Sequence, residues 1–348
     1  MMKRYSISFI RRKAEDLLVS KAIPVHDAEV IVDSMLEADI CGVNTHGIKM
    51  LAPYVHKIDN LAFNITGGGV TPIKQSPSFS VIDANNAIGA VSASYAVDVC
   101  VERAQEYGMH TVFLRHCNTF GPAFYYVEKM ARQGMIGFVC SNAPAAMPAF
   151  NGLEVMLGTN PMAFASPSKS KGTIVLDMAT SVVAKSRFEM ARIKGEKLPE
   201  GWALDKDGNP TTDPVEAIKG FVLPMAGFKG YGIALAIDLL SGFLSGSSYL
   251  NNVNKFYSNN GKGMDVGQMF IAINPAMVYE GDFFEDMDGY LGTIRKSIVI
   301  EGRKIAIPGD DRIAKRKESL EKGIELTEDT VLKLEKLFGE HLKVESIV

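Results

Sequence analysis

The chain has 348 residues, 47% of them hydrophobic and 22% charged, which is enough apolar material for one large domain or two interlocked lobes. Its formal net charge of −3 argues against nucleic acid or an anionic membrane as a partner, because both attract basic proteins. The four cysteines form no CxxC pair, so we expect no zinc site, no disulfide framework and a cytoplasmic protein with reduced thiols. The first residues lack the apolar core of a secretory signal, and no apolar stretch is long enough to span a bilayer.

The N-terminal part of the chain predicts three helices. Ser8 is a candidate cap for the first, whose apolar residues share one face. A second helix follows Pro24 and ends near Gly42. A third is expected to run from Thr45, as its N-cap, through Lys57.

After residue 77, short apolar runs alternate with helical patterns. We expect strands at 78–82, 111–114, 136–140 and 173–176, and helices at 90–107 and 122–133. This alternation is typical of a largely parallel α/β sheet. The strands lead into polar or small-residue loops at 115–121, 141–144 and 177–181, which we expect at one edge of the sheet as a binding cleft. The helix that begins at Pro122 should attract an anion to its N-terminus.

The second half of the chain carries weaker signals before a well-signalled final helix. We expect a short helix at 183–193, irregular structure from 195 to 226 and an apolar helix at 232–244. A final helix is capped by Thr327 and ends at Gly339.

Three side chains are candidates for chemistry. His46 follows Thr45 at an expected helix N-terminus, where the helix dipole disfavours the imidazolium form. A neutral imidazole can take a proton from a 2-hydroxy acid, although a surface or capping histidine fits the same position. His116 lies in the expected cleft. Lys229, among glycines that allow close backbone approach, is either a ligand for an anionic oxygen or a surface lysine.

Two motifs are weaker than they look. Residues 230–235 begin like a GxGxxG fingerprint but end in Leu235, and no proper GxGxxG occurs in the chain. Residues 205–216 have the ligand spacing of an EF-hand, but Pro210 replaces the required glycine. We therefore expect a turn at 207–209 and no metal site.

The chain resembles the malate/L-lactate dehydrogenase family, whose relatives include ureidoglycolate, sulfolactate and diketogulonate oxidoreductases. The resemblance covers nearly the whole sequence. It is carried by the segments GVNTHG (42–47), NTFGPA (118–123), LGTNPMAF (157–164), DMAT (177–180), DKDGNPTTDP (205–214) and GFKGYG (227–232).

The resemblance implies a non-Rossmann α/β fold with a mixed sheet, flanking helices and a helical N-terminal segment. It implies a helical substrate and dimerisation lobe from residues 1–75 and 285–348, and a nicotinamide-binding lobe from residues 76–284. It also implies an NAD- or NADP-dependent enzyme that interconverts a small 2-hydroxy acid and its 2-oxo acid, assembled as a homodimer.

Matching positions suggest roles for individual residues. Thr45, His46 and Thr159 correspond to substrate-side positions, and we add Asn118 and Arg115 from the same cleft. The positions matched to the cofactor are Asn142, Ala143, Asp177, Met178, Ala179, Lys229, Gly309 and Asp310.

Two departures put the chemistry in question. The family's catalytic histidine is replaced by Thr119, whose hydroxyl is no base near neutral pH. The family's carboxylate-binding arginine is replaced by Met50, and an adjacent Lys49 on one continuous helix would point about 100° away. Three readings stay open. His46 or His116 moves the proton while Lys49, Arg115 or Lys229 binds the carboxylate; the substrate is a different, less acidic one; or the chain keeps the cofactor without the chemistry.

Overall fold

The computed structural model describes residues 3–65, 69–170, 172–258 and 260–344. Residues 1–2, 66–68 and 345–348, which belong to the expected helical lobe, lie outside the described residues. Among the described residues, no helix is long and apolar enough to cross a membrane.

The N-terminal helices form as the apolar spacing predicts, with two differences at their starts. Helix α1 (Ile7–Ser20) is capped by Ser6 rather than Ser8, because the Ser6 hydroxyl accepts the Phe9 N–H at 3.3 Å. Helix α2 (Val25–Ile40) follows Pro24 as expected. The third predicted helix is wrong in its first half. Two 3-10 turns, η1 (Asn44–His46) and η2 (Ile48–Met50), precede a shorter α3 (Leu51–Asp59), since Gly47 between them is extended.

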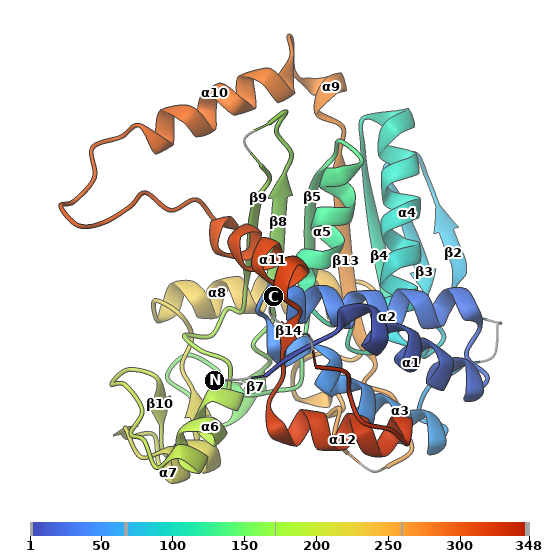
Figure 1. The fold of residues 1–348 in the computed structure, drawn as a ribbon. Coiled ribbons are helices and arrows are strands. Elements are labelled where there is room, and N and C mark those ends of the chain that lie inside the picture. Colours follow the sequence, from blue (N-terminus) through green and yellow to red (C-terminus); the bar gives the residue numbers. More distant parts are fainter. Residues whose placement is uncertain (1–2, 66–68, 171, 259, 345–348) are drawn as a thin grey trace.

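A seven-stranded sheet forms the centre of the molecule (Figure 1). Its strand order is β2-β3-β4-β13-β5-β8-β9. The bounds are Thr71–Gln75 (β2), Phe79–Asp83 (β3), Met109–Cys117 (β4), Ile136–Ser141 (β5), Met162–Ser166 (β8), Ile174–Met178 (β9) and Val266–Ile273 (β13).

The sheet is mixed, so the prediction of largely parallel pairing is wrong. Within the sheet, β3 and β4 are the parallel pair, and the other pairings are antiparallel. Strand β13 from late in the chain lies between β4 and β5, and β8 lies between β5 and β9. Because both run in the opposite direction, β3, β4, β5 and β9 still point the same way. The loops that follow these four strands therefore lie at one edge of the sheet, as expected. The cause is the insertion of two antiparallel strands, which the local sequence could not reveal.

The two faces of the sheet carry different helices. Val139 and Phe270 pack with α4 (Gly89–Tyr107) and α5 (Ala123–Arg132) in the main core. Their strand neighbours point to the opposite face, as alternation requires, where Cys140 and Met269 pack with Ile237 and Leu240. That second face is covered by α8 (Phe228–Ile237) and the π-helix η3 (Asp238–Phe243). The apolar helix expected at 232–244 thus begins four residues earlier and changes to π geometry at Asp238.

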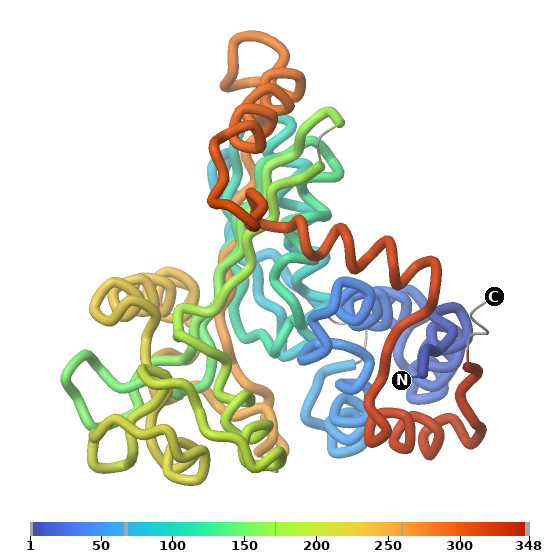
Figure 2. Tube along the Cα trace, turned by 60° about the vertical axis from the view of Figure 1, so that its left-hand side comes forward, coloured from blue at the N-terminus to red at the C-terminus, as the bar shows by residue number. Residues whose placement is uncertain are grey.

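A smaller unit follows β9 and lies at the lower left of Figure 2. The segment expected to be irregular contains short elements, because Asp213 caps a helix with Pro214 in its first turn. Its helices and strands are α6 (Ser186–Lys194), β10 (Ala203–Leu204), β11 (Pro210–Thr211), α7 (Pro214–Lys219) and β12 (Phe221–Val222). Two further short strands, β6 (Met147–Pro148) and β7 (Val155–Leu157), pair with each other, and the 3-10 turn η4 is Leu250–Asn252.

The C-terminal segment returns to the N-terminal helices after a projecting arm. Helix α9 (Pro275–Val278) and α10 (Phe283–Arg295) extend from the top of the sheet, and a long loop leads back to α11 (Asp310–Lys322) (Figures 1 and 2). Strand β14 (Ile324–Glu325) pairs with β1 (Arg4–Tyr5). Helix α12 (Glu328–Phe338) packs on α1 and α3, with the predicted Thr327 cap and Gly339 end.

Candidate active site

Thr119 lies on the α4 side of the sheet, just beyond the end of β4. Its carbonyl accepts a hydrogen bond from the Tyr54 hydroxyl at 3.0 Å. A Cβ on Gly89, at the start of α4, would lie 2.1 Å from that carbonyl oxygen. Thr119 is therefore fixed between α3 and α4, and glycine is required at position 89 for this close approach.

Asn118 is buried and its amide is used within the loop. Its Nδ2 donates to the carbonyl of Ala87 at 2.9 Å, and its Oδ1 accepts from the Met264 N–H at 2.8 Å. The side chain thus holds neighbouring loops together.

Asp177, at the end of β9, occupies the helix N-terminus that was expected to attract an anionic ligand. Its carboxylate accepts the Phe124 N–H of α5 at 2.9 Å. Burial raises the pKa of Asp177, while the Phe124 N–H and the charge of Arg312 oppose the rise. The anion at this helix is therefore a side chain of the protein, and the following Met178 and Ala179 are partly buried at the same edge.

The loop after β5 is held by a buried amide network. The Asn142 Nδ2 donates to the Ser248 carbonyl at 2.8 Å, and its Oδ1 accepts from the Gly267 N–H at 2.9 Å. The N–H of Ala143 donates to Asn160 at 3.0 Å. These bonds fix the loop and leave the small Ala143 side chain at the edge of the sheet.

His46 ends the first 3-10 turn and is partly buried. Burial, together with the positive charge of Lys49, lowers the pKa of its imidazole to about 4. This lowered pKa favours a neutral imidazole at neutral pH, and its main cause is desolvation rather than a helix dipole, since no α-helix begins at Thr45. Lys49, three residues after His46, is close enough for its charge to contribute to this lowered pKa. Thr45 is exposed in the same turn.

His116 and Arg115 lie on the opposite face of the sheet from Thr119. The His116 N–H donates to the hydroxyl of Ser247, which lies four residues after the end of η3. Both side chains bind the Asp83 carboxylate at 2.9 Å. Burial raises the pKa of Asp83, but hydrogen bonds from the Asn85 N–H, His116 and Arg115 outweigh it and leave the pKa below its usual value. The structure therefore places this pair away from Thr119.

The remaining predicted residues are spread along the edge strands. The Thr159 carbonyl accepts from both the N–H and the hydroxyl of Thr180, which ties the loop before β8 to the end of β9. Gly309 has a φ of +105° beside Val175, and Asp310 pairs with Arg295 at 2.7 Å. Lys229 is exposed in the first turn of α8 and forms no ion pair with another described residue.

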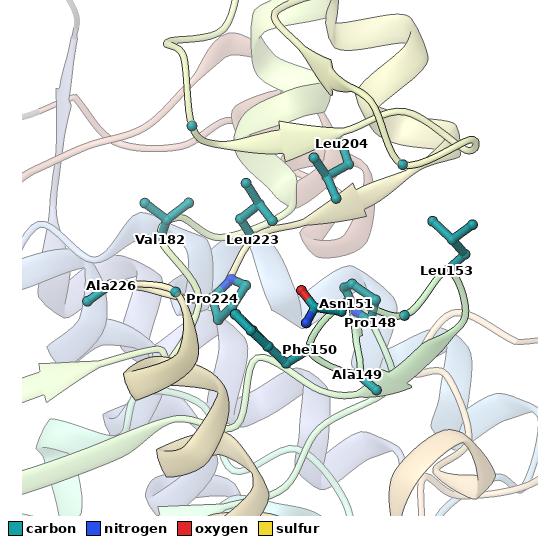
Figure 3. A pocket seen from close by; sticks show the side chains of 14 residues that line it. Pro148, Ala149, Phe150, Asn151, Leu153, Val182, Leu204, Leu223, Pro224 and Ala226 are labelled. Atoms are coloured by element: carbon teal, nitrogen blue, oxygen red, sulfur yellow. The ribbon is translucent and has the colours of Figure 1, made fainter.

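A cavity of about 430 Å³ lies in the smaller unit, and its lining includes none of the predicted site residues (Figure 3). Uncharged side chains line it, among them Phe150, Leu204 and Pro224. It adjoins the edge of the sheet because the N–H of Met225 donates to the carbonyl of Thr180.

No group of three or more histidine, cysteine, aspartate or glutamate side chains suited to a metal occurs in the part of the chain that the structure describes. The Asp205 carboxylate instead accepts the N–H groups of Asp207 and Asn209, both at 2.9 Å. The EF-hand-like spacing is therefore a closed turn, as expected.

Sequence reasoning missed two residues that hold the site. Tyr54 was treated as part of a helix, and its bond to Thr119 had no local signal. Asp39 supports the His46 segment by accepting the N–H of Ile48. A signal for Asp39 was available, because it falls on the apolar face of α2, three and four residues after Leu36 and Met35, where a charge needs a partner.

This mixed sheet, with small and polar loops at one edge and no Gly-rich dinucleotide turn, defines an α/β protein outside the Rossmann class. Residues 5–335 match the family model described as malate/L-lactate dehydrogenase. The chain belongs to this family.

Known relatives agree over nearly the whole chain. It is 37% identical to the L-sulfolactate dehydrogenase of Methanocaldococcus jannaschii, over 85% of each protein. The solved structure of sulfolactate dehydrogenase from that organism superimposes with a TM-score of 0.90 at 33% identity, covering 98% of both chains. The ureidoglycolate dehydrogenase (NAD(+)) of Escherichia coli O157:H7 is 30% identical, over 90% of each.

Proposed function

We propose that the protein is an NAD- or NADP-dependent dehydrogenase that interconverts a small 2-hydroxy acid and its 2-oxo acid. The observation that carries the proposal is the presence of His46, with its lowered pKa, in a chain whose relatives are dehydrogenases named for small acids. The proposal extends to a cytoplasmic location, which four buried free cysteines support.

The residues at the sheet edge fit a nicotinamide dinucleotide in their chemistry. Ala143 and Ala179 are small enough to leave the adjacent backbone open to a ligand. Lys229 offers a positive charge without an ion pair among the described residues, which suits a phosphate oxygen. We therefore assign cofactor contacts to the loops at 142–143 and 177–179 and to Lys229, with Gly309 and Asp310 as further candidates.

When bound, the nicotinamide ring accepts or donates the hydride at C2 of the substrate. As the hydride leaves C2, the hydroxyl becomes acidic, and neutral His46 takes its proton; in the reverse direction His46 returns it. Lys49 is the candidate for the C1 carboxylate because its charge already acts on His46. His116 and Arg115 lie on the other face with Asp83, so we favour His46 over His116 as the proton-transfer group.

With Lys49 assigned to the C1 carboxylate, a second carboxylate on a malate-like substrate would need another cation, and the carboxylate-binding arginine expected from the family resemblance is absent. Met50 stands at that position, and its sulfur lies 3.8 Å from the Tyr257 hydroxyl. Lys57, one helical turn beyond Tyr54, is buried and donates to the Ser258 carbonyl. A 2-hydroxy acid with an uncharged substituent at C3 therefore fits this surface better than a dicarboxylate does.

We also propose that the protein forms a homodimer. The loop between α10 and α11 exposes apolar side chains that a monomer would leave in water: Ile298 is fully exposed, and Ile300 is 78% exposed. The arm projects from the body in both views (Figures 1 and 2). A second copy is the proposed partner, and sedimentation of wild type and of an Ile298→Asp, Ile300→Asp variant tests this. A variant that sediments like wild type removes the arm from the interface.

The dehydrogenase proposal is tested by a nicotinamide absorbance assay with NADH and NADPH and a panel of 2-oxo acids. The panel contains pyruvate and longer monocarboxylates, with oxaloacetate and oxalurate for comparison. Turnover of monocarboxylates above oxaloacetate supports both the activity and the substrate class. Tight cofactor binding without turnover of any member would favour the competing function, a cofactor-binding protein that has lost the chemistry.

A further inference from the structure

Asp39 has a buried carboxylate directly beneath the segment that carries His46. The residue is 4% exposed, and its Oδ2 accepts the Ile48 N–H at 2.6 Å. A Cβ on Gly47 would lie 2.0 Å from Oδ1 and 2.2 Å from Cγ of this carboxylate. The carboxylate therefore fills the space beside Gly47, between His46 and the bonded Ile48 N–H.

The His46 segment has little support of its own. The first turn closes through the His46 N–H to Val43 at 3.0 Å and a long bond from Gly47 to Asn44 at 3.4 Å. The extended Gly47 interrupts the turns, so no helical hydrogen-bond ladder runs through the segment. A side-chain acceptor at this break is what connects the segment to α2.

The burial of this carboxylate is itself unfavourable. Desolvation raises the pKa of Asp39 to about 7, although the Ile48 N–H and the charge of Lys49 lower it. An apolar residue on this face of α2 would avoid that desolvation. The structure thus keeps a costly acceptor at the one place where the backbone after His46 needs it.

We propose that Asp39 is a positioning residue that holds the His46 imidazole in its catalytic orientation. The inference rests on the proposed role of His46 in proton transfer. Asp39 itself touches no substrate. It acts by fixing the Gly47–Ile48 peptide, and an imidazole misplaced by about 1 Å can lose ~10²-fold in rate.

The test compares Asp39→Val, which has no acceptor, with Asp39→Asn, which keeps one. Asp33→Asn is the matched control, since Asp33 lies on the same helix but binds Arg11 and Tyr125 instead. The imidazole titration of His46 is followed by NMR, with the signal assigned from a His46→Gln variant. In parallel, kcat and the KM for cofactor are measured with the best substrate.

We expect Asp39→Val to move the His46 pKa upward toward the usual histidine range, as the segment becomes solvated. We expect kcat to fall by about 10- to 100-fold with little change in cofactor KM. Asp39→Asn and Asp33→Asn should keep the low His46 pKa and most of the turnover. If Asp39→Val does not fold, Asp39→Ser replaces it, because its hydroxyl is too short to reach the Ile48 N–H.

An unchanged His46 titration in the folded Val or Ser variant would overturn the positioning role, whatever the activity. An altered titration together with unchanged kcat would also overturn it, since position would then not matter for rate. A wild-type protein without turnover would refute the proposed function separately. The NMR comparison would then still decide whether Asp39 holds His46.

Discussion

The two histidines considered for proton transfer, His46 and His116, have opposite surroundings. His116 has a carboxylate partner in Asp83 and remains 40% exposed, which is the arrangement expected of an oriented base. His46 has no carboxylate partner among the described residues, and its pKa is lowered by burial together with the charge of Lys49. Yet His116 lies on the η3 face of the sheet, while the α4 face holds Thr119. A histidine–carboxylate pair is therefore weaker evidence for a role in proton transfer than the position of the histidine relative to the other candidate residues.

The contrast between the two histidines is tested most directly by removing each imidazole in turn. His46→Ala should lower turnover by at least ~10²-fold, because proton transfer from the substrate hydroxyl loses its acceptor. His116→Asn should leave turnover close to that of wild type. Steady-state kinetics with the best substrate from the panel measures both. The reverse ranking of the two variants would move the chemistry to the Asp83–His116 pair.

The proposed preference for an uncharged substituent at C3 of the substrate is tested by adding a positive charge at position 50. Met50→Arg should improve kcat/KM for oxaloacetate by about 10- to 100-fold relative to a monocarboxylate. A charge-assisted hydrogen bond contributes about 1.5–3 kcal/mol. Met50→Gln is the control of similar size without charge. Equal changes for both classes of acid would mean that residue 50 does not contact the substituent at C3.

The Asp83 cluster should matter for stability rather than for rate. Asp83→Ala is expected to lower the free energy of unfolding by about 1.5–3 kcal/mol at neutral pH, since it removes the acceptor of Arg115 and His116. The folded pKa of Asp83 lies below its unfolded value, so this stabilisation is present above pH ~4 and is lost as the pH falls through the folded pKa.

Urea unfolding of wild type and Asp83→Ala between pH 3 and 8 measures this difference. A difference in unfolding free energy between the two proteins that stays constant to the lowest pH would show that the carboxylate charge is not its source. A large loss of kcat in the folded variant would place Asp83 in the catalytic machinery after all.

The smallest effect on turnover is expected from a substitution at Thr119. Thr119→Val keeps the shape of the side chain and the carbonyl that accepts from Tyr54, so turnover should fall by less than ~10-fold, the worth of one neutral hydrogen bond. A loss as large as that of His46→Ala would make the Thr119 hydroxyl part of the proton path.

Local patterns predicted much of the fold. The start of α2, the end of α4 and the start of α12 follow from Pro24, Gly108 and the Thr327 cap, because helix boundaries depend on neighbouring residues. The sheet pairing could not be read in this way. Strand β13 enters between β4 and β5 from about 150 residues away, and alternating elements carry no sign of such an insertion.

The candidate site shows the same limit. The direction of the His46 pKa was expected from the sequence, but its cause was not, because the extended Gly47 and the buried Asp39 are tertiary features. The sequence preferred His46 and left His116 open, and it could not show that His116 lies on the η3 face of the sheet with Asp83. Motif positions indicated the candidate residues, and tertiary packing determines where each of them lies.

The activity that we propose for the chain is hydride transfer between a nicotinamide cofactor and C2 of a small 2-oxo acid. The most direct measurement uses NADH or NADPH carrying deuterium at both C4 positions, with product analysis by mass spectrometry. We predict one deuterium at C2 of the hydroxy acid, in wild type but to a much smaller extent in His46→Ala. Cofactor binding without deuterium in any product of the panel would contradict the account.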